Sequence, residues 1–186
     1  MKLEKIIVEL NKYLECTDLE IIKQLKSDLE EQLRKETAYK TTSKSRVNAI
    51  SKMQKYNTKR KYEHLNGYAK NDNQFIFTNS YYMVSINDSL GYEDNGKNFK
   101  DMFNKFDRVI SEDNKIELNY NDIMTSYKLK EKVCNIQGVN FDSEYLKQFI
   151  DILRNNANVY INSNDKILYV ENKENEKGVL LGCKTY

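Results

Sequence analysis

The hydrophobic periodicity of this chain changes near Glu63, and that change limits the folds open to it. Before this point, apolar residues recur three or four positions apart, which is the spacing of one face of an α-helix. After it, apolar and polar residues alternate in short runs separated by Asn, Asp and Gly, which is typical of strands and turns. The pattern predicts an α+β protein with a helical N-terminal region over 1–62 and a strand-rich domain over 63–186.

Two amphipathic helices are predicted at the start of the chain. Their apolar stripes span 3–14 and 19–33, with a short break at 16–18. Thr17 is a candidate N-cap, and Glu20 three residues later completes a capping box. So short a break favours a helical hairpin, or arm, whose stripes pack against each other and the main domain. A dimer interface is the alternative, so a monomer and a homodimer both remain open.

The segment 37–62 carries eight Lys or Arg residues and no Asp or Glu. Because the whole chain is only +2, the remainder sums to −6. Val47, Ile50 and Met53 give a third helix over 44–57 one narrow apolar edge, and Asn57 with Thr58 is expected to end it. The cations should then lie on several sides of that edge, as a broad cationic surface. The candidate binding residues are Lys40, Lys44, Arg46, Lys52, Lys55, Tyr56, Lys59, Arg60, Lys61 and Tyr62.

The second domain is predicted to contain two strand-helix-strand units. Its clearest part begins near Val133, where two strands flank a Gly turn and Asp142 or Ser143 caps a helix that ends near Leu153. Three strands follow, separated by NSND and NKENEKG turns. The earlier unit has strands near 65–68, 74–77, 82–86 and 115–120, a loop over 88–98 and helices over 99–106 and 122–130.

Three segments of this domain carry a resemblance to a known group of proteins. They are GYAKNDNQFIFTNSYYMVSIND (67–88), VNFDSEYLKQFIDIL (139–153) and ILYVENKENEKGVLLGCKTY (167–186). They resemble small phage-encoded proteins that look like a single domain of the bacterial sliding clamp. The resemblance implies a clamp-domain-like body and a phage origin, and no activity. The helix predicted over 142–154 is net negative, which disfavours holding a phosphate backbone as a clamp does.

The sequence lacks the residue sets of the common enzyme and metal sites. A single histidine, His64, excludes a His-based triad and a multi-histidine metal site. Six glycines form no phosphate-cradling motif. The three cysteines, Cys16, Cys134 and Cys183, are widely spaced and fit core thiols in a reducing compartment. The carboxylates of the 88–98 loop lack EF-hand spacing. We therefore expect no enzyme activity, no cofactor and no metal.

Two functions fit a catalytically empty chain with one cationic segment. The first is an inhibitor of phage type, anti-CRISPR-like, that docks on a host protein or ribonucleoprotein complex that processes nucleic acid. The second is an accessory protein of phage replication or regulation that binds DNA or RNA directly through 37–62. The chain has no signal peptide pattern and no membrane-length apolar run, which predicts the host cytoplasm and no membrane partner.

Overall fold

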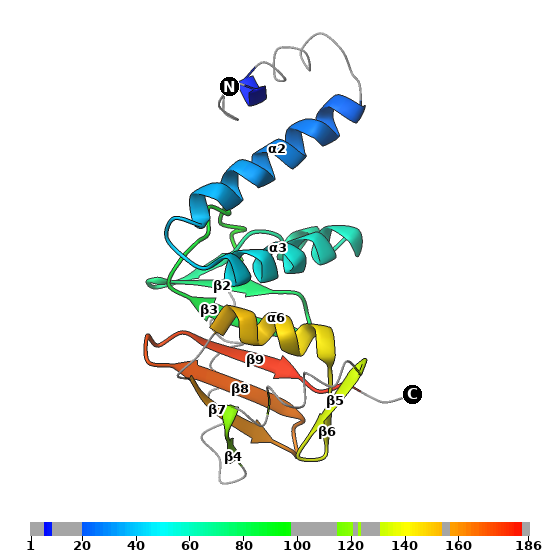
Figure 1. Cartoon of the computed structure of the whole chain (residues 1–186), viewed down its shortest axis with the longest axis vertical. Helices are drawn as coiled ribbons and strands as arrows, with labels where there is room; N and C mark the ends of the chain where they lie inside the picture. The colour runs from blue at the N-terminus through cyan, green and yellow to red at the C-terminus, as the bar shows by residue number, and fades with distance from the viewer. Residues whose placement is uncertain are drawn as a thin grey trace.

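An antiparallel sheet of seven strands, in the order β1-β2-β3-β9-β8-β7-β4, organises the computed structural model of the chain (Figure 1). The structure describes residues 6–8, 20–97, 115–120, 123, 131–153 and 157–183. The strands are β1 (Ala69–Asn71), β2 (Gln74–Thr78), β3 (Tyr82–Ile86), β4 (Lys115–Leu118), β7 (Ala157–Asn162), β8 (Ile167–Asn172) and β9 (Lys177–Leu181). Strands β5 (Val133–Ile136) and β6 (Val139–Asp142) pair separately as a hairpin. The α+β class, with helices before a strand-rich body, is confirmed.

Alternation along the strands sorts their side chains onto the two faces of the sheet. In β2 and β3, Phe77 and Val84 belong to the main core, whereas Ile76 and Met83 belong to a smaller cluster. Successive side chains of a strand point to opposite faces, so the smaller cluster lies behind the sheet. The main core therefore forms on the face that the helices cover.

Helices α3 (Lys44–Lys59) and α6 (Ser143–Leu153) pack against each other over this core (Figure 1). The apolar edge predicted for α3 is confirmed, because Val47, Ile50 and Met53 are fully buried. Helix α6 sits close to β9: a Cβ at Gly178 would lie only 2.6 Å from side-chain atoms of Leu153 and Phe149. α3 therefore belongs to the α+β body, although its sequence falls within the region 1–62.

The end of α3 differs from the prediction. Asn57 does not end the helix; its side chain is buried and donates to the carbonyls of Leu65 and Thr78. The helix ends two residues later, where the Tyr62 amide donates to the Asn57 carbonyl and the Lys61 amide to the Thr58 carbonyl. This is a Schellman motif, and Lys61 occupies its left-handed position with φ 59°. The motif turns the chain back toward the body.

The body contains the same sequence of elements twice. Helix α3 precedes β1, β2 and β3, and helix α6 precedes β7, β8 and β9. The two units meet where β3 pairs with β9 and where α3 contacts α6. The second unit, with β5 and β6 before α6, has the predicted order of strands and helix, whereas the described helix of the first unit is α3, which comes before its strands. The helix predicted over 99–106 lies outside the described residues, as does most of the one predicted over 122–130.

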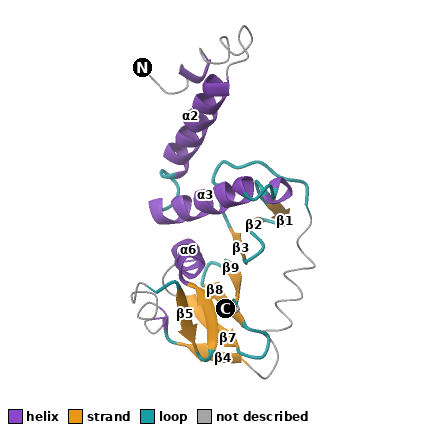
Figure 2. Cartoon of the chain, turned by 90° about the vertical axis from the view of Figure 1, so that its right-hand side faces the viewer, coloured by secondary structure: helices purple, strands orange, loops and turns teal. Residues whose placement is uncertain are grey.

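Helix α2 (Glu20–Ala38) extends away from this body (Figures 1 and 2). Ala38 is its one buried residue. Arg34 ties α2 to the body, because its guanidinium donates to the Leu90 carbonyl and to the Ser51 hydroxyl and lies 3.7 Å from the centre of the Tyr92 ring. Residues 6–8 are helical, and the predicted break at 16–18 lies outside the described residues. Among the described helices, none has the length and hydropathy needed to cross a membrane.

Candidate binding surface

Four lysines of the basic segment share the exposed side of α3. We call Lys44, Lys52, Lys55 and Lys59 the lysine face; all four are exposed. They line up because eight of the sixteen residues of α3 are buried, which leaves one side of the helix in solvent. The structure thus gives a stripe and not the broad cationic surface that the sequence predicts. Within the described residues, no carboxylate lies at ion-pair distance from any of these four ammonium groups.

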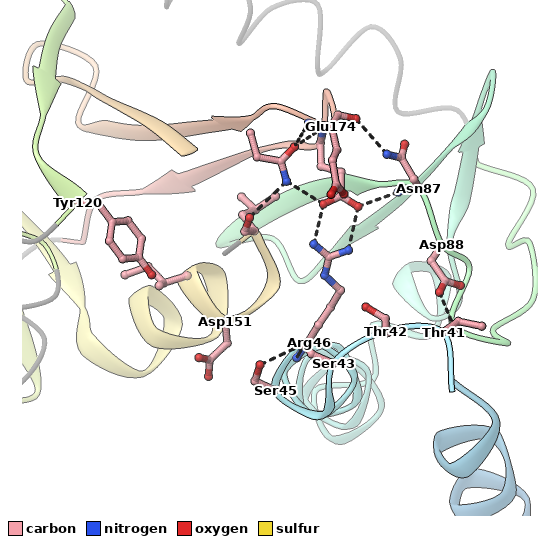
Figure 3. Close-up of a pocket in the computed structure, with 14 residues that line it drawn as sticks. Thr41, Thr42, Ser43, Ser45, Arg46, Asn87, Asp88, Tyr120, Asp151 and Glu174 are labelled. Atoms are coloured by element: carbon pink, nitrogen blue, oxygen red, sulfur yellow. Dashed lines mark hydrogen bonds and ion pairs between the residues drawn. The ribbon is translucent and has the colours of Figure 1, made fainter. Parts of the chain in front are cut away.

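Arg46, one of the predicted binding residues, points into the protein (Figure 3). Its guanidinium forms a two-pronged ion pair with Glu176, at 2.8 and 2.6 Å, and donates to the Ile152 carbonyl at 2.7 Å. Both residues are buried, at 8% and 1% exposure. Since all of its charge is used inside the fold, Arg46 is a structural residue, and its prediction as a binding residue is wrong.

The other predicted cations lie at the two ends of α3. Lys40 is exposed in the turn between α2 and α3. Arg60 and Lys61 are exposed at the Schellman motif, next to Lys59. The Arg60 guanidinium lies 5.5 Å from the centre of the Tyr56 ring, a cation–π arrangement. These cations extend the lysine face at both ends.

Four tyrosines from distant parts of the chain meet beside Arg60. We call Tyr56, Tyr62, Tyr81 and Tyr145 the tyrosine cluster. Tyr81 and Tyr145 stack with ring centres 4.8 Å apart, and Tyr56 meets both edge-on at 6.0 and 5.9 Å. The sequence predicts only Tyr56 and Tyr62, because Tyr81 and Tyr145 lie far along the chain. The local sequence indicates a turn before Tyr81 and the start of a helix before Tyr145. Neither pattern indicates a binding site.

The tyrosine cluster also changes the acidity of its phenols. Burial opposes ionisation of Tyr56, but hydrogen bonds from Tyr81 and Tyr145 and the charge of Arg60 outweigh it and hold the Tyr56 pKa below its ordinary value. The pKa of Tyr145 is raised by burial and by its hydrogen bond to Tyr56.

A groove of about 520 Å³ runs between α3 and α6. Lys52 and Lys55 line one side, and Glu144, Lys147 and Asp151 of α6 line the other. Lys147 is paired with Asp151 at 2.8 Å, so its charge is compensated locally. The groove therefore takes its positive character from α3.

A larger polar cavity, of about 1010 Å³, opens where the start of α3, the end of α6 and the β8–β9 turn meet (Figure 3). Arg46 and Glu176 line it and satisfy each other, and Asp88 accepts a hydrogen bond from Thr41. Several of its polar groups are thus engaged with one another, whereas Asp151 pairs with Lys147 outside the lining.

The described residues contain no group of three or more His, Cys, Asp or Glu side chains that could hold a metal ion. His64 is exposed in the short 3₁₀ helix η1 (Glu63–Leu65), with its ring 6.3 Å from that of Tyr62. No protein-family model, curated protein or solved structure matches this chain. Its function is therefore inferred from the lysine face and the tyrosine cluster.

Proposed function

We propose that this chain is a non-enzymatic binding protein, an inhibitor of the kind that phages encode. It docks through the lysine face onto an anionic surface of a host complex that processes nucleic acid, such as a CRISPR nuclease. The observation that carries the proposal is a stripe of four exposed lysines without a carboxylate partner in the described part of the chain. A small protein with such a stripe is steered electrostatically toward an anionic partner.

The spacing of these lysines supports a role in binding. Lys55 and Lys59 lie one helical turn apart, and like charges at that spacing destabilise a helix by a few tenths of a kcal/mol. The other surface helices offset such charges: Lys26 pairs with Glu30 in α2, and Lys147 with Asp151 in α6. The four lysines of the lysine face have no such carboxylate partner among the described residues, which leaves them available to an external partner.

Charge reversal on this helix tests the proposal. The variant Lys52→Glu/Lys55→Glu changes the net charge by −4, and so does the control Lys166→Glu/Lys173→Glu, which alters two exposed lysines in sheet turns. Inhibition of nuclease cleavage and capture of the nuclease complex are measured for each protein. We expect the α3 variant to lose at least about tenfold in potency and the control to match the wild type. Equal losses would show that only overall charge matters, and no inhibition by the wild type would contradict the proposal.

A second function, direct binding of DNA or RNA as an accessory of phage replication or regulation, is favoured by the aromatic rings next to the cations. Tyr56 and Tyr62 lie beside Arg60 at the end of the lysine face, an arrangement suited to nucleic acid. Gel shifts at low and physiological salt test it, since binding through several phosphates weakens steeply with salt. Unchanged mobility of a DNA or RNA probe at low salt would end this second function.

A further inference from the structure

The tyrosine cluster joins four elements into one surface. Tyr56 comes from α3, Tyr62 from the segment after it, Tyr81 from the β2–β3 turn and Tyr145 from the first turn of α6. One face of the Tyr81 ring rests on Tyr145, at 4.8 Å and an interplanar angle of 24°. Tyr81 is nevertheless 42% exposed. An exposed tyrosine whose ring rests on a second ring can stack with a planar ligand.

Hydrogen bonds fix the position of Tyr81 in advance. The Asn79 side-chain oxygen accepts from the amides of Tyr81 and Tyr82, both at 3.0 Å, and Asn79 is fully buried. The side-chain amide of Asn57, in α3, donates to the Thr78 carbonyl at the start of the same turn. The Tyr81 carbonyl accepts from Leu181 of β9. Little conformational entropy remains to be lost there on binding.

Tyr145 is held in the same way. The Asp142 carboxylate caps α6 by accepting from the amides of Glu144 and Tyr145, at 2.9 and 3.0 Å. Asp142 and Glu144 place negative charge on the α6 side of the tyrosine cluster. On the α3 side, Arg60 and its two neighbouring lysines are exposed. The tyrosine cluster is therefore flanked by positive charge on the α3 side and by negative charge on the α6 side. An anionic ligand would bind along the α3 side.

We propose that the tyrosine cluster binds an unpaired base of single-stranded nucleic acid. The base stacks on the open face of Tyr81, and Lys59, Arg60 and Lys61 contact the adjoining phosphates. Stacking on an aromatic ring accepts any base, because every base has a π-face. A base inside a duplex cannot reach the ring, which gives a preference for single strands. Lys and Arg side chains that neutralise phosphates supply most of the affinity for a nucleic-acid backbone. This inference rests on the second function proposed above.

Fluorescence anisotropy with a labelled single-stranded oligonucleotide and its duplex, at low salt, tests the inference. We expect the wild type to favour the single strand and Tyr81→Ala to weaken that binding by about tenfold, with little change for the duplex. Tyr81→Phe keeps the ring and should bind as the wild type does. Thermal unfolding of each variant confirms that it folds. Because the chain has no Trp, quenching of tyrosine emission by the single strand gives a second readout.

The outcomes separate this inference from the functions it builds on. If Tyr81→Ala binds both probes as the wild type does, while Lys52→Glu/Lys55→Glu loses binding, the stacking inference is overturned and phosphate binding stands. If Tyr81→Ala leaves nucleic-acid binding intact but weakens capture of the nuclease, the tyrosine cluster is a protein contact and the inference is again overturned. If the wild type binds neither probe, both the inference and the second function fail.

Discussion

At the scale of single residues, Arg46 shows how burial changes the role of a charged side chain from binding to stabilising the fold. It is one of eight cations in an acid-free segment, and its neighbours in the chain do not distinguish it from the others. It is buried because Glu176, 130 positions away, reaches it across the end of α6. Glu176 also accepts from the Asn87 amide and from the Asn172 side chain, so one carboxylate joins three segments.

Glu176→Gln should therefore destabilise the fold strongly. The substitution leaves the Arg46 charge buried without a compensating charge, a situation that costs about 3–5 kcal/mol. The partly exposed pair of Lys147 and Asp151 is the matched control, and Asp151→Asn should cost about 0–1 kcal/mol. Urea unfolding measures both free energies. Equal losses for the two variants would contradict a structural role for the buried pair.

Tyr92, also a single residue, should make the free energy of unfolding depend on pH. Burial raises the pKa of Tyr92 to about 12, above its ordinary value of 10.0. Between these values the folded protein keeps the proton and the unfolded chain releases it. The free energy of unfolding should therefore fall by about 1.4 kcal/mol per pH unit for this group as the pH rises. Urea unfolding at several pH values below and above pH 10 measures this dependence. The free energy of unfolding of Tyr92→Phe should fall less steeply with pH than that of the wild type, and an identical fall would refute the prediction.

At the scale of elements, helix α3 combines three roles along its length. Its buried side carries the apolar edge that packs on the sheet and α6. Its exposed side carries the lysine face. Its C-terminal Schellman motif brings Tyr62 to within 6.5 Å of Tyr56 and keeps Arg60 beside them. The end of the helix therefore shapes one edge of the proposed binding surface.

Lys61→Gly should stabilise the protein. Lys61 sits in the left-handed region at φ 59°, where a residue with a Cβ is strained and glycine is not. We expect a gain of about 0.5–1 kcal/mol in the free energy of unfolding. Lys61→Ala removes the same charge but keeps the Cβ, so it should stay within about 0.5 kcal/mol of the wild type. A gain from Ala as large as that from Gly would assign the effect to charge instead.

At the scale of the whole molecule, the body and α2 are stabilised by different interactions. The main core of described residues takes side chains from α3, α6, the sheet and the β5–β6 hairpin, and only Ala38 from α2. Arg34 supplies the polar attachment of α2 near its C-terminal end. The lysine face and the tyrosine cluster both lie on the body. Folding and the proposed binding should therefore depend little on the first half of α2.

Removal of residues 1–28 tests this division. The shortened chain keeps Arg34 and Ala38, so we expect its free energy of unfolding to stay within about 1 kcal/mol of the full chain. Nuclease inhibition and oligonucleotide binding should also be retained. Urea unfolding monitored by circular dichroism, with the same binding assays, provides the measurement. Loss of folding would show that the N-terminal segment is part of the core, and loss of binding alone would place a partner contact on it.

The local elements follow from the sequence alone. Helical spacing predicts α3 and α6, alternation predicts β2 and β3, and the turn signal around Asp72 falls at a residue with φ 54°. These features depend on neighbours only a few positions apart, so the chain encodes them directly. The α+β fold class and the position of the basic segment can be predicted from the sequence for the same reason.

The tertiary structure decided which of these residues are available. It buried Arg46, aligned four lysines on one side of α3, and placed the Tyr68 ring against those of Phe75 and Phe77, at 4.8 and 6.1 Å. It also brought Tyr81 and Tyr145 to Tyr56. Each outcome depends on packing between residues that are distant in the chain. Local periodicity carries no information about such contacts, so the proposed binding surface could be identified only from the tertiary structure.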